Sequence, residues 1–85
     1  MNAAKNITVY TTSSCAYCVM VKKWLSAKGR MFQEVNLDDA PNERQRLYQM
    51  SGQLTVPVTV VSDASGRQDI TVGWNPAKLA AALAD

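Results

Sequence analysis

The sequence predicts an α/β fold with elements in the order βαβαββα, in which a mixed four-stranded sheet is flanked by three helices. Four short segments have the alternation and β-branched residues of strands, and three stretches have apolar residues at helical spacing. A strand–helix–strand unit places its strands parallel through a right-handed crossover, whereas a closing hairpin makes its strands antiparallel. The 85 residues, 47% hydrophobic and 19% charged, fit one globular domain spanning residues 1–85.

The chain begins with an expected strand at residues 7–11, where β-rich residues alternate. The polar residues 12–14 break this pattern before a helix that we expect from Ala16 to about Lys28. Its apolar residues form two neighbouring stripes, Cys18, Val21 and Leu25 in one and Tyr17, Met20 and Trp24 in the other. Gly29 follows as a helix stop, and the charge of Lys28 suits the negative end of the helix dipole.

Strand character returns at residues 31–37, with three apolar residues expected on one face, namely Met31, Val35 and Leu37. A second helix is expected to start at Asp38 and Asp39, whose carboxylates suit the positive dipole end, with Pro41 in its first turn. This helix carries the apolar residues Leu47, Tyr48 and Met50, and we expect it to end at Gly52. We expect the methionines of the chain to fill gaps in the core.

The last third of the chain is expected to form a strand at residues 56–61, a hairpin loop at residues 62–66 and a returning strand at residues 68–72. Asn75 then caps the last helix, and Pro76 takes its first position. The apolar stripe of this helix is Leu79, Ala82 and Leu83. A helix of about ten residues is too short to be stable alone, so we expect it to dock on the sheet.

Composition excludes several classes of function. Nine Lys and Arg against seven Asp and Glu leave a net charge of +2, too small to indicate a nucleic-acid or anionic-membrane partner. The absence of histidine excludes His-based acid–base catalysis, Cys–His nucleophiles and mixed Cys/His zinc sites within one chain. No run approaches the roughly 20 apolar residues of a membrane span, and the polar N-terminus lacks a signal-peptide core. We therefore expect a cytoplasmic monomer without a metal or an organic cofactor.

The two cysteines, Cys15 and Cys18, are the main chemical feature of the sequence. Their spacing places both at the start of the first helix, where unpaired amides and the positive dipole end favour a thiolate at Cys15. Cys18 is expected further inside, where it can hydrogen-bond the Cys15 sulfur. Cys15 is then the nucleophile that attacks a substrate disulfide, and Cys18 resolves the mixed disulfide to leave a Cys15–Cys18 disulfide.

Three alternatives to redox chemistry remain open for this pair. A structural disulfide across four residues removes little loop entropy, which counts against that interpretation. Half of a zinc or iron–sulfur site shared across a dimer is the second alternative, since one chain supplies two of the four ligands needed. The third is that the two cysteines are incidental.

Pro57 is the second feature that bears on function. A proline cannot donate in a sheet ladder, so at the start of a strand it marks an edge or a special turn. Together with the upstream cysteines, it favours a cis Val56–Pro57 bond facing Cys15. Such a turn leaves the backbone groups of Val56 free to pair with an extended substrate segment.

With these features, the chain resembles the glutaredoxin branch of the thioredoxin superfamily over essentially its whole length. The residues that carry the likeness are Val9-Tyr10, Cys15-Ala16-Tyr17-Cys18, Thr55-Val56-Pro57 and Gly73. The resemblance implies a thioredoxin-like fold, a nucleophilic Cys15, a resolving Cys18 and a cis-proline at Pro57. It also implies a substrate-binding surface that includes Tyr17, Thr55, Val56, Pro57, Gly73 and Trp74.

The sequence departs from glutathione-using members of this family at several positions. Ala16 stands where they typically have proline, and Thr12 stands where they usually have a Lys or Arg. Residues 72–76 contain one glycine and no acid, where those members often have a Gly-Gly pair followed by Thr/Cys-Asp. This stretch is more similar to NrdH-type redoxins, although Asn75 replaces their usual arginine.

We therefore expect a thiol–disulfide oxidoreductase that reduces protein disulfides, with ribonucleotide reductase as one substrate that the NrdH likeness implies. Its electrons come from NADPH through thioredoxin reductase or a low-molecular-weight thiol system. A glutathione-dependent glutaredoxin and a dimeric [2Fe–2S] cluster carrier are the alternatives. Trp74 is expected either to pack under the last helix or to line the docking groove, and Lys22 and Lys23 are expected at the surface.

Overall fold

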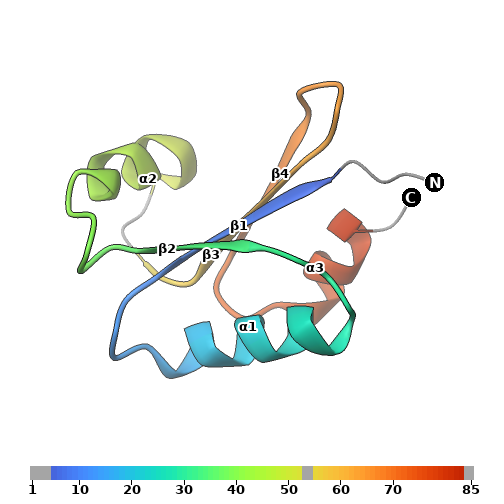
Figure 1. Ribbon diagram of the computed structural model, residues 1–85. Helices are drawn as coiled ribbons and strands as arrows, with labels where there is room; N and C mark the ends of the chain where they lie inside the picture. Colours follow the sequence, from blue (N-terminus) through green and yellow to red (C-terminus); the bar gives the residue numbers. More distant parts are fainter. Residues whose placement is uncertain (1–4, 53–54, 84–85) are drawn as a thin grey trace.

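The computed structural model describes residues 5–52 and 55–83, which form one sheet with helices on both faces (Figure 1). The elements in chain order are β1 (Asn6–Thr11), α1 (Ala16–Ala27), β2 (Gln33–Asn36), α2 (Glu43–Ser51), β3 (Val58–Ser62), β4 (Gln68–Val72) and α3 (Pro76–Leu83). This is the predicted βαβαββα order. No helix of the described residues is long and apolar enough to cross a membrane.

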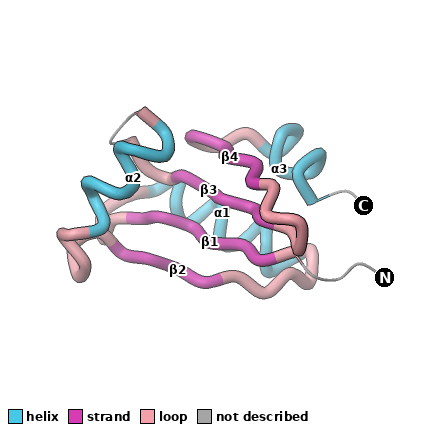
Figure 2. The backbone as a smooth tube through the Cα atoms, turned by 90° about the horizontal axis from the view of Figure 1, so that it is seen from above, coloured by secondary structure: helices cyan, strands magenta, loops and turns pink. Residues whose placement is uncertain are grey.

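The four strands lie in the order β2-β1-β3-β4, so the first strand is central (Figure 2). β1 and β2 are parallel, with Val9 opposite Glu34, as the crossover rule predicts. β3 is antiparallel to both of its neighbours, and its hairpin with β4 pairs Val58 with Val72. The predicted mixed sheet is therefore confirmed, and its two edges are β2 and β4.

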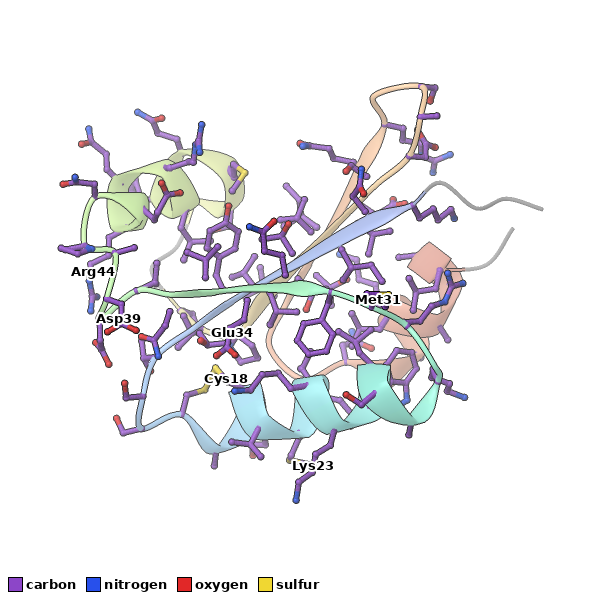
Figure 3. The ribbon with its side chains drawn as sticks, viewed as in Figure 1. Cys18, Lys23, Met31, Glu34, Asp39 and Arg44 are labelled. Atoms are coloured by element: carbon purple, nitrogen blue, oxygen red, sulfur yellow. A yellow bond between two sulfur atoms is a disulfide. The ribbon has the colours of Figure 1, made fainter. Side chains whose placement is uncertain are left out.

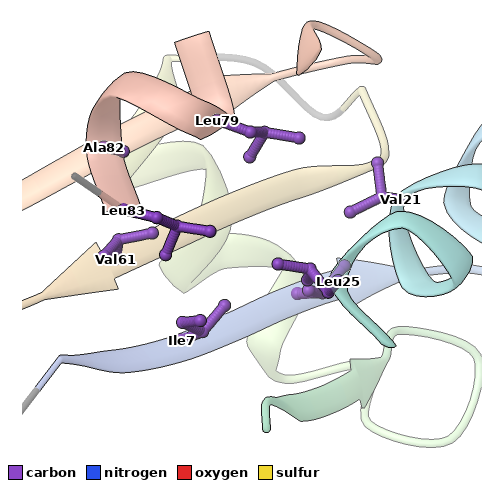
Figure 4. Packing of buried hydrophobic residues seen from close by; sticks show 8 residues of the cluster. Ile7, Val21, Leu25, Val61, Leu79, Ala82 and Leu83 are labelled. Carbon is purple, nitrogen blue, oxygen red and sulfur yellow. The ribbon is translucent and has the colours of Figure 1, made fainter. Parts of the chain in front are cut away.

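Alternation along β1 and β3 sends apolar side chains to two separate cores. The larger core lies between the sheet and the pair α1 and α3 (Figure 4), and consists of Ile7, Val9, Val21, Leu25, Val61, Leu79, Ala82 and Leu83. The second core lies on the α2 side of the sheet and consists of Tyr10, Leu37, Leu47, Val58 and Val60. Because both faces are covered, β3 is buried along most of its length, as expected for an interior strand.

The short helix α3 is docked on the sheet, as predicted, and is held at both ends. At its start, the Asn75 side chain accepts a hydrogen bond from the Lys78 amide at 3.1 Å, which confirms the predicted cap. At its end, the Lys5 ammonium and the Arg30 guanidinium donate to the carbonyls of Ala82 and Leu83, each at 2.9 Å. Cations suit the negative end of a helix dipole, so these contacts compensate for the small length of α3.

Three predictions about the second βα unit are wrong. The second strand covers only Gln33–Asn36, and Met31 before it is 91% exposed instead of lying on a buried face. Asp38 and Asp39 lie in a turn before α2, which begins only at Glu43. Pro41, expected in the first turn of this helix, also lies in a turn before it, and Tyr48 is exposed on α2. Met20 is also exposed, which means that neither it nor Met31 fills a gap in the core.

Candidate active site

Cys15 and Cys18 lie at the first turn of α1 and are joined by a disulfide, with their Cα atoms 5.3 Å apart. Cys15 is the N-cap residue in extended conformation, and its Sγ accepts a hydrogen bond from the Cys18 amide at 3.1 Å. In the reduced protein the same amide and the helix dipole would stabilise a Cys15 thiolate. The helix start thus places one sulfur where negative charge is favoured.

The two cysteines differ in their access to solvent. Cys15 is half-buried at the helix end, whereas Cys18 is only 1% exposed because it faces the sheet together with Val21 and Leu25. Cys15 is therefore the more accessible residue of the disulfide, and Cys18 lies inside. The burial of Cys18 agrees with its expected inner position, and the attacking and resolving roles of the two cysteines stay predictions.

Asp38 fixes the loop that leads into Cys15. Its carboxylate accepts a hydrogen bond from the Ser13 amide at 2.9 Å, and its own amide donates to the Asn36 side chain at 2.9 Å. The Asn36 amide group in turn donates to the Ser13 hydroxyl at 3.3 Å. The Ser13 hydrogen bonds lower the pKa of the Asp38 carboxyl, since they favour its charged form. Asp38 is thus a part of the cysteine loop and not of a helix start.

A second polar cluster joins α1 to the two parallel strands, and we call it the Glu34 cluster. The Glu34 carboxylate on β2 accepts hydrogen bonds from the Thr11 hydroxyl at 2.7 Å and from the Lys22 ammonium at 3.0 Å. Lys22 lies one helical turn after Cys18 on the same side of α1, and Figure 3 shows Glu34 and Cys18 in the space between β2 and α1. The Thr11 hydroxyl, followed by Lys22, lowers the pKa of the Glu34 carboxyl.

The sequence could not reveal the contacts of Asp38 in the cysteine loop or those of the Glu34 cluster. Glu34 and Asp38 find their partners, Thr11 and Ser13, across 23 and 25 residues of sequence. The short Asn36-x-Asp38 spacing is the only local signal, because an Asn side chain often hydrogen-bonds the amide two residues later. Lys22 is expected at the surface, with electrostatic help to acidic partners as the alternative, and its ion pair with Glu34 is a third contact that the sequence does not indicate.

Pro57 lies at the same end of the sheet as the cysteine loop. The Val56–Pro57 bond is cis, as predicted, and β3 begins directly after it with Val58 paired to Tyr10. Gly73 adopts a left-handed conformation (φ 82°), and its amide donates to the Pro57 carbonyl at 2.8 Å. Within residues 5–52 and 55–83, the backbone N–H and C=O of Val56 make no hydrogen bond.

The aromatic residues predicted to bind substrate have different surroundings. Tyr17, between the cysteines, is 58% exposed. Trp74 is partly buried and packs against the core beneath α1 and α3, which is the first of the two positions expected for it. Thr55 is exposed and precedes the cis bond. Their roles in binding stay predictions.

Neither the cysteines nor the described carboxylates form a metal site by themselves. In the part of the chain that the structure describes, no group of three or more His, Cys, Asp or Glu residues could hold a metal ion. A cluster bound through Cys15 and Cys18 would therefore need ligands from outside this set.

Comparison with known proteins identifies the family. The family model for glutaredoxin matches residues 7–65. The glutaredoxin-like protein NrdH of Lactococcus lactis subsp. cremoris is 35% identical over 74 residues, which covers 87% of this chain and 94% of that protein. Glutaredoxin 3 of Escherichia coli K12 is 40% identical over 52 residues, or 61% of this chain. The match spans 63% of the length of glutaredoxin 3, less than two thirds of that relative.

Solved structures show the same fold. The glutaredoxin from Archaeoglobus fulgidus superimposes with a TM-score of 0.81 at 22% identity, covering 99% of this chain and 90% of that one. The NrdH-redoxin from Escherichia coli gives a TM-score of 0.78 at 24% identity and covers 94% of this chain and 96% of that one. The family model matches residues 7–65 and the Lactococcus NrdH match covers 87% of this chain, so this chain belongs to the glutaredoxin family.

Proposed function

We propose that this protein reduces protein disulfides through Cys15 and Cys18, and that thioredoxin reductase rather than glutathione returns it to the dithiol form. The Cys15 thiolate attacks one sulfur of the substrate disulfide, and the other substrate sulfur leaves as a thiolate that takes up a proton. Cys18 loses its proton and attacks the Cys15 sulfur, which releases the second substrate thiol. Two electrons have then passed to the substrate, and the Cys15–Cys18 disulfide remains.

The Val56 backbone supports a protein or peptide as the substrate. Its N–H and C=O have no hydrogen-bond partner among the described residues and lie beside the buried Pro57. An extended segment can pair with such groups as an added strand, which would align its disulfide with Cys15. This interaction uses the backbone of the substrate and does not depend on its side chains, so it suits more than one protein substrate.

The start of α3 favours thioredoxin reductase over glutathione as the electron donor, because it lacks groups that would bind glutathione. The Asn75 side chain already caps the helix, and Pro76 has no N–H to offer an anion. The nearby cation, Lys78, donates to the Ile70 carbonyl at 2.8 Å, and no carboxylate lies between Gly73 and Leu83. Glutathione therefore lacks an acceptor for its free amine here. One missing charge-assisted contact costs about 1.5–3 kcal/mol, more than tenfold in affinity.

The relatives support the same choice. The Lactococcus NrdH protein aligns with nearly the whole chain, whereas glutaredoxin 3 aligns with a shorter part. The Escherichia coli NrdH-redoxin, which shares the fold, has a thioredoxin-like activity profile. This protein is proposed to share that profile.

NADPH oxidation tests the proposal. The oxidised protein is assayed with thioredoxin reductase, or with glutathione plus glutathione reductase, at equal protein concentration and with insulin as the disulfide substrate. We expect faster turnover with thioredoxin reductase by about tenfold or more. Cys15→Ser sets the background of both assays. Faster turnover with glutathione would contradict the proposal and make the protein a glutathione-dependent glutaredoxin.

A further inference from the structure

The loop of residues 12–14, which connects β1 to Cys15, is held by side chains from a distant part of the chain. The Ser13 amide donates to the Asp38 carboxylate at 2.9 Å. The Ser13 hydroxyl accepts a hydrogen bond from the Asn36 side chain at 3.3 Å. Two hydrogen bonds thus fix the residue that lies two positions before Cys15.

Three further hydrogen bonds fix the position of Asp38. Its own amide donates to the Asn36 side chain at 2.9 Å, and the amide of the preceding Leu37 donates to the Thr11 carbonyl at 2.8 Å. The Arg44 guanidinium on α2 donates to the second oxygen of the Asp38 carboxylate at 3.4 Å. Figure 3 shows Arg44 at the same end of the sheet as Cys18. The carboxylate is therefore a fixed anchor for the cysteine loop.

The conformation of this loop determines how Cys15 caps α1. The Cys15 backbone is extended (φ −103°, ψ 110°), and its sulfur accepts a hydrogen bond from the Cys18 amide at 3.1 Å. In the dithiol protein, this hydrogen bond and the helix dipole favour negative charge on the sulfur. A loop without its anchor would give Cys15 other conformations, in which the hydrogen bond is absent and the thiolate is less stable.

We infer that Asp38 is a positioning residue for the proposed nucleophile: by holding Ser13, it keeps Cys15 at the start of α1 and so raises the fraction of Cys15 thiolate. The inference rests on the proposed role of Cys15. Asp38 acts through the loop and not through its charge, because a carboxylate near the sulfur would disfavour a second negative charge. The acceptor oxygen of Asp38 is therefore the part of the side chain that matters.

The test measures alkylation of the dithiol protein by iodoacetamide as a function of pH. The Cys15 thiolate displaces iodide, so the rate follows the thiolate fraction. We expect Asp38→Ala, which removes the acceptor, to move the midpoint of the pH profile up by about one pH unit, a tenfold loss of thiolate at lower pH. A more basic thiolate is also a stronger nucleophile, so the net effect is about threefold slower alkylation below the midpoint and up to about threefold faster alkylation well above it.

Two other variants separate the actions of the side chain. Asp38→Asn keeps an oxygen that can accept from the Ser13 amide but carries no charge, so its pH profile should stay close to that of the unaltered protein. Asp63→Ala is the matched control, because Asp63 holds the β3–β4 hairpin loop in the same way. Its carboxylate accepts from the Ser65 amide at 3.0 Å and from the Ser65 hydroxyl at 2.6 Å. This control should lower the midpoint of urea unfolding without moving the midpoint of alkylation.

Three results would overturn the inference while leaving the role of Cys15 intact. The first is an unchanged pH profile for Asp38→Ala. The second is a shift to lower pH in both Asp38 variants, which would mean that the charge acts directly on the sulfur. The third is an equal shift in Asp63→Ala, which would attribute the effect to lost stability.

A fallback variant and a mapping experiment complete the test. If Asp38→Ala does not fold, as judged by circular dichroism, Asn36→Ala is measured in its place, since it removes a second hydrogen bond to the loop. Its midpoint must also move to higher pH, and an unchanged midpoint would overturn the inference. Mass spectrometry of peptides from the unaltered protein identifies the alkylated cysteine. Alkylation of Cys18 in place of Cys15 would overturn the proposed function and this inference with it.

Discussion

At the scale of single residues, the position of each cysteine on α1 supports its proposed role. Cys15 ends the loop and caps the helix, so its sulfur accepts a hydrogen bond from the Cys18 amide, and the residue is only half-buried. Cys18 faces the sheet, where burial keeps it from competing disulfides in solution. The same helix turn therefore separates a half-buried Cys15, proposed as the nucleophile, from a buried Cys18, proposed as the resolving thiol.

Asn75 and Asn42 precede α3 and α2, and they provide a matched pair for testing helix capping. Asn75 accepts a hydrogen bond from the Lys78 amide, whereas Asn42 has helical backbone angles and makes no side-chain cap. We expect Asn75→Ala to lower the free energy of unfolding by about 1 kcal/mol, because it leaves the Lys78 amide without its partner.

Urea unfolding of the oxidised protein measures both variants. Asn42→Ala should change the free energy of unfolding by less than about 0.5 kcal/mol. If the two substitutions were equally destabilising, the Asn75 side chain would not be acting as a cap.

Residue roles that act locally could be predicted from sequence, and those that act over a distance could not. The Asn75 cap and the Gly52 stop follow from the chain immediately beside them, and both are found as predicted. Carboxylates commonly precede a helix, so the sequence predicts that Asp38 lies at the start of one. Its partner, Ser13, is 25 residues away, so only the folded chain reveals the contact.

At the scale of elements, the Glu34 cluster holds α1 against β1 and β2. Thr11, Glu34 and Lys22 come from these three elements, and the shared carboxylate oxygen connects them. Thr11 is buried, so its hydroxyl would lose a hydrogen-bond partner if the carboxylate were removed or protonated. The cluster thus links the position of the cysteine helix to the parallel strand pair.

This cluster predicts a pH dependence of stability. The pKa of Glu34 in the folded protein is lowered from 4.5, chiefly by the Thr11 hydroxyl and then by Lys22. The charged form is therefore favoured by folding, and its contribution is present above the unfolded pKa and lost as pH falls through the lower folded value. Glu34 is about one third exposed, so we expect less than about 1 kcal/mol.

Urea unfolding at pH about 6 and about 3 measures this contribution. Between these two pH values, the free energy of unfolding should fall by more in the unaltered protein than in the Glu34→Gln variant. Thr11→Val, which keeps the side-chain volume but removes the hydroxyl, should reduce the loss in the same way. An identical loss in all three proteins would show that Glu34 does not contribute to the pH dependence.

Element boundaries were predictable where periodicity is strong and not where a strand is short. The stripe of α1 and the hairpin strand β4 match their predicted residues closely. β2 has only four residues at an edge of the sheet, and the apolar Met31 before it extends the predicted strand beyond its true start. An exposed apolar residue in a connection has the same sequence signature as a buried one.

At the scale of the whole molecule, the fold brings three distant segments to one end of the sheet. The cysteine loop follows β1, Pro57 precedes β3, and Gly73 follows β4, with its amide bound to the Pro57 carbonyl. The parallel pairing of the first two strands was predictable from handedness rules. The position of β1 between β2 and β3 could not be predicted, because its pairing with β3 depends on contacts across most of the chain.

The central claim is that Cys15 attacks the substrate disulfide and Cys18 resolves the intermediate. It is tested most directly by incubating Cys18→Ser with oxidised insulin and mapping the product by mass spectrometry of peptides under non-reducing conditions. We predict a stable mixed disulfide between Cys15 and an insulin chain, because the resolving thiol is absent. Cys15→Ser should give no such adduct and no turnover. A Cys15→Ser protein that still reduces insulin, or a Cys18→Ser protein that forms no adduct, would contradict the account.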